Sequence, residues 1–302
     1  MTIIVGIEYS GGILIASDSQ ATAQRGAPFK RVAIKLRTLQ STVGRTATRI
    51  IMAGSGSDPY ISRAAELMQN QCGQRQFGSP RMVAECLEDA VTELYKRYVV
   101  SRAAKLGTEV GEETLDVAFM LGVHCEGVAN EPRSLYIVYP NGVAERELGY
   151  ATIGSGAPYA EYLLARLYRE SMALDFAVKT AVYVIEEVKK IDPYCGGQTH
   201  VAILTDTGFL QYEDAQINQL ATALANQDAQ VKQIWRFLSG DPEALRELQQ
   251  AAHLQQQQHI AVPPPNPVQP EQRKDPGNGQ DPQATQTDNP ENGASKVGDE
   301  EK

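Results

Sequence analysis

The chain has 302 residues, of which 42 % are apolar, and it carries a formal net charge of −9 at pH 7. No apolar run reaches the ~18–20 residues of a membrane-spanning helix, and the N-terminal residues lack the basic leader of a secretory signal peptide. We therefore expect a cytoplasmic protein whose four cysteines stay free thiols in a reducing compartment. No basic patch stands out, so nucleic acid is not expected as a partner, and the His and Cys spacings form no zinc pattern.

The composition divides the chain into three expected parts: a folded domain over residues 1–213, a helical extension over 214–258 and a disordered tail over 259–302. Eight of the sixteen prolines lie in the tail, which is also rich in Gln and Asn and offers almost nothing to a hydrophobic core. In the extension, Val231, Ile234, Trp235 and Leu238 recur at helical spacing. The folded domain, at about 215 residues, can bury a full core without disulfides or metal ions.

The predicted elements begin with a β-hairpin. Residues 2–7 are apolar and largely β-branched, residues 10–12 form a Gly-rich turn, and residues 13–19 form a second strand. Two further strands are predicted over 30–36 and 49–53.

Two helices follow, each begun by a Ser that can cap the first turn and by a Pro within that turn. They are predicted to start at Ser57 and Ser79, and the first of them ends near Cys72. The later elements are strands over 115–124, 134–139, 143–147 and 150–153, helices over 158–170 and 175–190, and strands over 199–205 and 209–212.

The order of these elements is strands, two helices, strands, two helices and strands. Such segregated runs argue against a βαβ alternation. Two antiparallel sheets packed face to face, with a helix pair outside each, would bury every apolar face. We therefore expect an α+β fold, a four-layer αββα sandwich.

The chemistry of the N-terminus is unusual, because Thr2 directly follows Met1 at the start of a strand that looks buried. Removal of Met1 would expose a residue that carries a hydroxyl nucleophile together with an α-amino base, whose ordinary pKa is about 7.7–8.0. The alternative is that Thr2 is an ordinary residue, since many proteins begin with Met-Thr.

Three further residues support the catalytic interpretation of Thr2. Asp18 ends the second strand of the hairpin, which returns it toward Thr2, and Lys35 lies inside a predicted apolar strand. A charged Lys beside the terminal amine favours its neutral, proton-accepting form. The Gly54 N–H precedes a capped helix and could face a developing oxyanion. The alternative for Asp18 and Lys35 is a plain structural ion pair.

Taken together, these residues resemble the proteasome β-subunit family, the threonine-type N-terminal-nucleophile hydrolases. The resemblance spans about residues 2–212 and rests on motifs that occur in the family's order. They are TIIVGI at 2–7, IASDSQAT at 15–22, KL at 35–36, MAGSGSD at 52–58, YATIGSGAPY at 150–159 and DPYCGG at 192–197.

The resemblance implies a role for each matching residue. Thr2 would be the nucleophile, Asp18 and Lys35 would tune and position it, and the Gly54 N–H would bind the oxyanion. Ser155, Asp192 and Cys195 would surround the free amine. Thr22 and Gly54 would hold the substrate backbone in a β-strand-like manner, and the side-chain pocket would be lined by Ala21, Ala33, Arg37, Met52 and Gly56. No cofactor and no metal are implied.

This sequence departs from the family pattern in several places. Lys35 lies one residue further from Thr2 than usual, and Gln20 replaces the usual Arg. Cys195 replaces a Ser, and a thiol is the weaker hydrogen-bond partner. We expect no propeptide, so that methionine removal alone would expose Thr2, as the resemblance to propeptide-free bacterial members implies.

The function expected from the resemblance is a threonine endopeptidase that degrades peptides or unfolded proteins inside homo-oligomeric stacked rings. Whether α-type subunits or an ATPase unfoldase join the rings stays open. So does the cleavage preference, since Arg37 and Met52 favour acidic and apolar side chains respectively. Two alternatives are a non-catalytic ring scaffold and an amide hydrolase of the same fold that acts on a small molecule.

Overall fold

The computed structural model of the chain describes residues 2–23, 29–41, 43, 47–109, 115–243, 246–247 and 250. Residues up to Asp241 form one compact unit, and residues from Pro242 onward form a second, which is described by itself. Its described residues, 242–243, 246–247 and 250, are helical. The tail expected over 259–302 lies outside the described residues, and the expected domain boundaries stay predictions.

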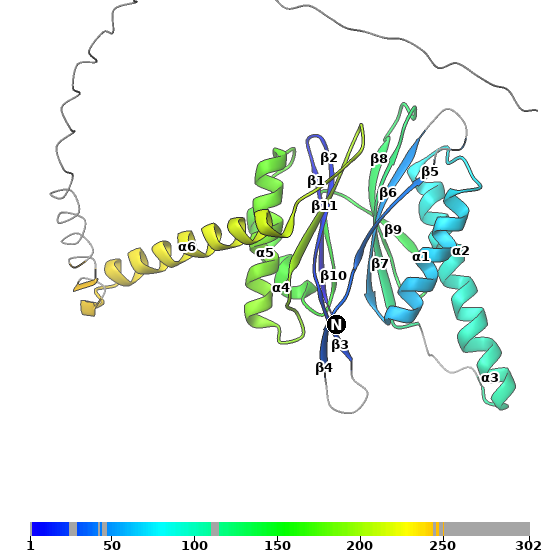
Figure 1. Ribbon diagram of the computed structural model, residues 1–302, viewed down its shortest axis with the longest axis horizontal. Coiled ribbons are helices and arrows are strands. Elements are labelled where there is room, and N and C mark those ends of the chain that lie inside the picture. The colour runs from blue at the N-terminus through cyan, green and yellow to red at the C-terminus, as the bar shows by residue number, and fades with distance from the viewer. Residues whose placement is uncertain are drawn as a thin grey trace, which may run out of the picture. The chain divides into compact units, whose positions relative to one another are not determined.

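Two antiparallel sheets of five strands each lie face to face (Figure 1). The first sheet has the order β10-β1-β2-β11-β12, with β1 (Ile3–Tyr9), β2 (Gly12–Asp18), β10 (Tyr150–Gly154), β11 (Thr199–Thr205) and β12 (Phe209–Gln211). The second has the order β5-β6-β7-β8-β9, with β5 (Leu36–Ser41), β6 (Thr48–Gly56), β7 (Val117–Cys125), β8 (Arg133–Val138) and β9 (Ala144–Glu147).

Helices cover the outer face of each sheet. The pair α1 (Asp58–Cys72) and α2 (Pro80–Tyr95) packs on the second sheet, and the pair α4 (Ala157–Leu167) and α5 (Leu174–Ile191) packs on the first (Figure 1). Beyond α2 the helix continues through a π-helical turn, η1 (Lys96–Val100), into α3 (Ser101–Leu106). The expected four-layer αββα sandwich is therefore confirmed.

Three apolar layers hold the sandwich together, and β1 contributes to two of them. Ile3 and Val5 pack under α4 and α5, whereas Ile4 packs between the two sheets. Side chains alternate across a strand, so a strand buried on both faces needs an uninterrupted apolar run, as residues 2–7 have. Burial of each large apolar side chain stabilises the fold by roughly 1.5–3 kcal/mol.

The strand predicted over residues 30–36 is wrong. The chain forms β4 (Phe29–Val32), which pairs with β3 (Gln20–Ala23) in a small separate sheet, and then β5 in the second sheet. Lys35 lies in the non-strand connection between β4 and β5. Val32 and Ile34 are 78 % and 72 % exposed, so the apolar run that suggested one buried strand is largely outside the core.

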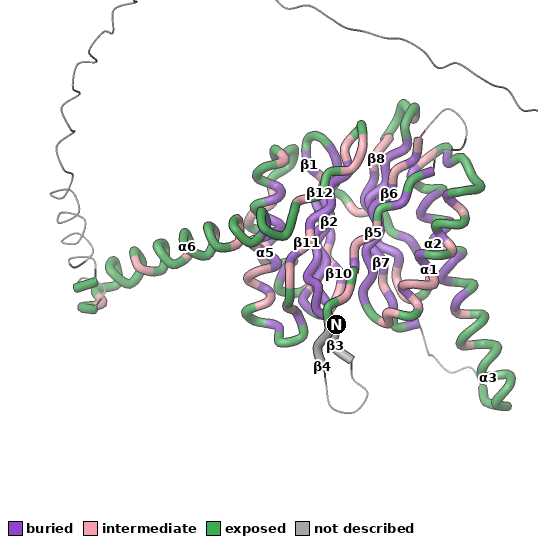
Figure 2. The backbone as a smooth tube through the Cα atoms, in the orientation of Figure 1, coloured by how far each residue is buried: buried purple, intermediate pink, exposed green. Residues whose placement is uncertain are grey.

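The last helix of the first unit is α6 (Asp214–Leu238), which lies within the helical extension expected over residues 214–258. A capping box between Glu213 and Gln216 starts it, and Ile217 and Leu220 pack with the α5 layer. Toward its C-terminal end most of α6 is exposed, including Trp235 (Figure 2). None of the described helices is long and apolar enough to cross a membrane.

Candidate active site

Three polar side chains meet at one end of the first sheet, where β1 begins and β2 ends. The register of β1 and β2 pairs Ile4 with Ser17, which sets Asp18 beside the start of β1. The Thr2 hydroxyl donates a hydrogen bond to Asp18 Oδ1 over 2.6 Å, and the Ile3 N–H donates to the same oxygen over 3.0 Å.

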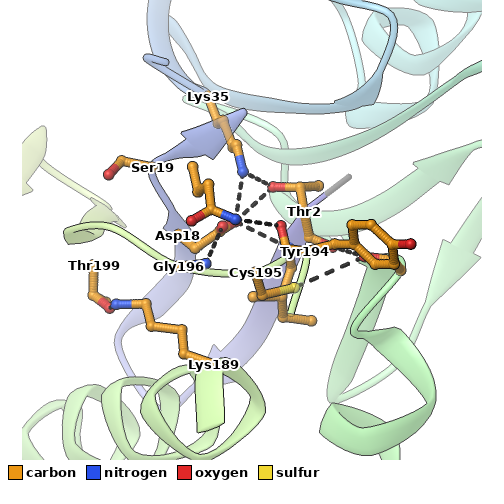
Figure 3. Close-up of polar contacts among 12 residues, drawn as sticks. Thr2, Asp18, Ser19, Lys35, Lys189, Tyr194, Cys195, Gly196 and Thr199 are labelled. Atoms are coloured by element: carbon orange, nitrogen blue, oxygen red, sulfur yellow. Dashed lines mark hydrogen bonds and ion pairs between the residues drawn. The ribbon is translucent and has the colours of Figure 1, made fainter. Parts of the chain in front are cut away.

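Lys35 completes this cluster from the connection between β4 and β5. Its Nζ lies 2.6 Å from Asp18 Oδ1 and donates a hydrogen bond to Thr2 Oγ1 (Figure 3). Thr2, Asp18 and Lys35 are 2 %, 0 % and 7 % exposed. The arrangement therefore holds a hydroxyl, a carboxylate and an ammonium in mutual contact and shielded from water.

Burial lowers the pKa of Lys35, because it disfavours the charged ammonium. The Asp18 carboxylate acts in the opposite direction through its charge and its hydrogen bond, and the Lys189 ammonium lowers the pKa further. The result is a lysine that holds its proton less tightly than an exposed one, directly beside a hydroxyl.

The loop between α5 and β11 fixes Asp18 from the other side. The Gly196 N–H donates to Asp18 Oδ2 over 3.0 Å, so both carboxylate oxygens are engaged. Gln20 N–H donates to the Gly196 carbonyl over 2.9 Å, and Gln198 N–H donates to Ser19 Oγ over 2.7 Å. These bonds anchor the loop against the end of β2 and the start of β3.

The same loop carries Asp192 and Cys195. Asp192 accepts hydrogen bonds from the Tyr194 N–H at 2.9 Å and from Cys195 Sγ at 3.3 Å. Burial alone would raise the pKa of Asp192, but hydrogen bonds from Tyr194, Ser155 and Cys195 outweigh it and lower the pKa. Asp192 is therefore held as a carboxylate.

Cys195 is a proton donor in this environment. Burial, helped by the negative charges of Asp18 and Asp192, raises the pKa of Cys195 to about 12. The thiol therefore keeps its proton at neutral pH, which removes its nucleophilic form. Its sulfur lies 3.8 Å from Ser155 Oγ, and Ser155 Oγ donates to the Thr2 carbonyl over 3.4 Å.

Two glycines allow the backbone to approach closely at this site. Gly154 has φ +104°, and a Cβ there would lie 2.1 Å from the Thr2 carbonyl oxygen. A Cβ on Gly54 would lie 2.5 Å from the Ile61 side chain on α1. The Gly54 N–H donates to the Lys35 carbonyl over 3.3 Å, so the predicted oxyanion role requires this long bond to open.

The predicted substrate-binding residues differ in their exposure. Ala21 and Ala33 are half-buried, Gly56 is exposed at the end of β6, and Thr22 lies in β3 with a side chain outside the described part of the structure. Met52 is 1 % exposed and belongs to the core between the second sheet and its helices. In the free chain Met52 therefore offers almost no surface, and its predicted pocket role stays a prediction.

Of the six predicted binding residues, Arg37 lines a groove. The groove, with a volume of about 610 Å³, lies between β5 and α1. Arg37 also donates to Ser62 Oγ on α1 over 3.3 Å.

A second polar cluster lies behind the site and was not predicted from the sequence. Lys189 Nζ donates to Thr199 Oγ1 at 2.6 Å and to Glu186 Oε1 at 2.8 Å, and Thr199 donates to Glu186 at 2.7 Å (Figure 3). Thr199 pairs with Asp18 across β11 and β2. The spacing of Glu186 and Lys189 on one helix is visible in the sequence, but their meeting with Thr199 depends on strand register. Among the described residues, no group of three or more His, Cys, Asp or Glu side chains could hold a metal ion.

Comparisons with known proteins identify the family of this chain. A family model described as "Proteasome subunit" matches residues 2–204. The chain is 22 % identical over 223 residues to proteasome subunit beta of Methanosphaerula palustris, covering 74 % of this chain and 95 % of the relative. It is 26 % identical over 204 residues to proteasome subunit beta of Methanoregula boonei, covering 68 % and 85 %.

Solved structures share the fold at low sequence identity. Anbu (ancestral beta-subunit) from Yersinia bercovieri aligns with a TM-score of 0.61 at 17 % identity, covering 76 % of this chain and 95 % of that one. The helical assembly of the Anbu complex from Pseudomonas aeruginosa aligns with a TM-score of 0.57 at 16 % identity, covering 88 % and 100 %. Because the family model covers more than half of the chain and both sheets, the chain belongs to the proteasome subunit family, as a β-type subunit.

Proposed function

We propose that the chain is a threonine endopeptidase subunit of a proteasome-like assembly, with Thr2 as its nucleophile after Met1 is removed. The observation that carries this proposal is the buried contact of Thr2 Oγ1 with both Asp18 and Lys35. A structural ion pair alone would not require a buried hydroxyl in contact with both of its charges.

The proposed reaction begins when the free Thr2 amine accepts the hydroxyl proton and Oγ1 attacks the carbonyl carbon of a peptide bond. Lys35, already bonded to Oγ1, stabilises the negative charge that develops there. The amine then returns the proton to the leaving amine of the substrate as the peptide bond breaks. Water, activated by the same amine, hydrolyses the ester on Thr2 and releases the acid product.

Residues around Thr2 support the amine in this scheme. The Ser155 hydroxyl holds the Thr2 carbonyl, and Asp192 supplies a fixed carboxylate nearby. The Cys195 thiol donates a hydrogen bond to Asp192. In this proposal it takes the hydrogen-bonding role of the serine that it replaces. Opening of the bond between the Gly54 N–H and the Lys35 carbonyl would free a donor for the oxyanion.

We further propose that the subunit acts in a homo-oligomeric assembly of rings or a related form, on peptides or unfolded proteins in the cytoplasm. Membership of the proteasome family supports the assembly. The solved relative from Pseudomonas aeruginosa, described as a helical assembly, shows that this fold also associates in other ways.

Substitution of the nucleophile tests the proposal. Thr2→Ala should reduce the hydrolysis of fluorogenic peptides by at least about 10³-fold, as removal of other catalytic nucleophiles does. Thr2→Ser, the matched control, keeps a hydroxyl and should retain measurable activity. Elution of both variants at the wild-type position in gel filtration shows that assembly is intact. Full hydrolysis by Thr2→Ala would refute the proposal.

A non-catalytic ring scaffold is the second candidate, and the engaged Gly54 N–H favours it. It predicts that the assembled wild-type protein hydrolyses none of the peptides and that its Thr2 stays unreactive toward covalent inhibitors.

A further inference from the structure

The helix α6 carries a seven-residue apolar repeat that is longer than its contact with the sandwich. The members of the repeat lie three, four or seven residues apart on one side of the helix: Ile217, Leu220, Leu224, Val231, Ile234 and Leu238. Gln227 interrupts the repeat once. Such a repeat is typical of a helix that packs against other helices along its whole length.

The two halves of this repeat have different surroundings. Ile217, Leu220 and Leu224 pack with the apolar layer of α5 and the first sheet. Beyond that contact α6 extends away from the sandwich (Figure 1). The large apolar side chains of its second half are all exposed, with Trp235 at 67 % (Figure 2). We call these five residues the apolar end of α6: Val231, Ile234, Trp235, Phe237 and Leu238.

The size of the apolar end indicates a surface that is covered in the working molecule. Single exposed apolar residues are common on proteins, whereas a cluster of five within about two turns of one helix marks an interaction site. Two such faces in contact would bury on the order of 1,000 Å² of total surface, which is the lower range for a specific interface between proteins.

The charges beside the apolar end are already paired within the same chain. Lys232 Nζ lies 2.6 Å from the Asp228 carboxylate, and Arg236 Nε lies 2.7 Å from the Asp241 carboxylate. A strongly charged partner such as nucleic acid is therefore not needed to neutralise this surface. Two copies of the helix, each with balanced charges, would not repel each other.

The rest of the chain is poorly suited to cover the apolar end. From residue 251 onward the sequence has no aromatic residue and few Leu, Ile or Val residues, and it is rich in Pro, Gln and Asn instead. An identical α6, by contrast, offers an apolar face of the same length. Membership of a family of oligomeric subunits brings such helices close together.

We infer that the apolar end of α6 packs against α6 of a second copy of this chain, in a helix pair that joins two subunits. The helix lies beyond residues 2–204, the part that the family model matches, so this contact is additional to those of the shared fold. The inference extends the proposed homo-oligomeric assembly and does not depend on the chemistry of Thr2.

Tryptophan fluorescence tests the inference on the full-length wild-type protein, because Trp235 is the only tryptophan of the chain. We expect the blue-shifted emission of a buried indole in a sample that sedimentation velocity shows to be assembled. Exposed-type emission in that sample would overturn the inference and leave the assembly standing. Buried-type emission in a monomer would also overturn it, since the chain would then cover its own helix. A monomer with exposed-type emission at every concentration would refute both the inference and the assembly.

A pair of variants assigns the emission to the helix pair. Ile234→Asp places a charge in the apolar end but keeps Trp235, and it should shift the emission to the red. Ala229→Asp adds the same charge at an exposed position on the opposite side of α6 and should leave the emission unchanged. Far-UV circular dichroism checks that both variants are folded. Emission that stays blue-shifted in folded Ile234→Asp would overturn the inference.

Cross-linking identifies the second copy as the partner. The four native cysteines are buried, so the wild-type protein should react little with a short bis-maleimide. Ile234→Cys should give several-fold more covalent pairs of subunits on a denaturing gel than Ala229→Cys, the matched control on the opposite side of the helix. Peptide mapping should locate the cross-link at residue 234 of both copies. Equal yields from the two variants would overturn the inference.

Discussion

At the scale of single residues, the contact of Lys35 with Asp18 decides how the site responds to substitution. Removal of one member of a buried ion pair leaves the other charge without a partner, which typically costs about 3–5 kcal/mol. In this site Asp18 would keep its hydrogen bonds from Thr2, Ile3 and Gly196, which reduce that cost.

We predict that Lys35→Met lowers the free energy of unfolding by about 2–4 kcal/mol and abolishes peptide hydrolysis, because the Asp18 carboxylate loses its counter-charge. Asp18→Asn combined with Lys35→Met should recover most of that stability without any activity. Urea unfolding and fluorogenic hydrolysis measure the two effects separately. Recovery of activity in the double variant would mean that the pair is only structural.

The lowered pKa of Lys35 also predicts a pH dependence. If protonated Lys35 is needed for catalysis, kcat/KM falls on the alkaline side with an apparent pKa below 10.5, the ordinary value for lysine.

At the scale of elements, the cluster of Lys189, Glu186 and Thr199 closes the loop that carries Asp192, Cys195 and Gly196. Lys189 and Glu186 lie in the last turns of α5, and Thr199 is the first residue of β11. The cluster thus joins the two ends of the loop that donates a hydrogen bond to Asp18. We interpret Lys189 as a positioning residue for the site.

We predict that Lys189→Met shifts the alkaline limb of kcat/KM to higher pH, because a cation that lowers the pKa of Lys35 is lost. It should also reduce kcat by roughly 10-fold through a looser loop. Lys190→Met is the matched control, since Lys190 is half-exposed and pairs with Glu187. The measurement is a pH–rate profile of all three proteins, and a loss of kcat without any shift of the limb would leave Lys189 a merely structural role.

The elements also show how far the sequence predicts this protein. The β1–β2 hairpin and both helix pairs were predictable, because their apolar runs and capping residues are local signals. The change of sheet between β4 and β5 was not, since Val32 and Ile34 look like core residues in the sequence but are exposed.

The candidate site likewise contains residues that the sequence predicts and contacts that it does not. Thr2, Asp18 and Lys35 could be named from the motif order, and the structure brings them together. Other features depend on strand register and helix packing, which local sequence patterns do not determine. They are the burial of Met52, the hydrogen bond of the Gly54 N–H and the cluster of Lys189, Glu186 and Thr199. The catalytic roles themselves stay predictions.

At the scale of the whole molecule, a cluster of polar side chains around Asp206 joins the two sheets at the end remote from Thr2. Asp206, in the turn after β11, accepts a hydrogen bond from Arg49 on its carbonyl at 2.9 Å and lies 3.2 Å from Arg133 Nη1. His124 Nε2 is 3.6 Å from the same carboxylate, and burial lowers the pKa of His124. The strand β11 spans about 20 Å from Thr199, which pairs with Asp18, to Thr205, which precedes Asp206. The cluster around Asp206 is therefore distant from the site.

We predict that Asp206→Ala lowers the free energy of unfolding by about 1 kcal/mol, as expected for a pair whose acid is largely exposed. Hydrolysis per folded molecule should not change. Asp175→Ala, at an exposed helical pair on α5, is the control and should cost less than about 0.5 kcal/mol. Chemical unfolding compares them, and a loss of activity in Asp206→Ala at full folding would show that the two ends of the sandwich are coupled.

The most direct test of the central claim is the intact mass of the purified, assembled protein before and after a covalent inhibitor selective for an N-terminal threonine. We predict a species that lacks Met1 and gains one inhibitor mass, and no labelling of Thr2→Ala. A species that retains Met1 and stays unlabelled would contradict the claim, because the amine base would be blocked. The chain would then be a scaffold or an inactive precursor, and Cys195→Ser would be the first variant to examine.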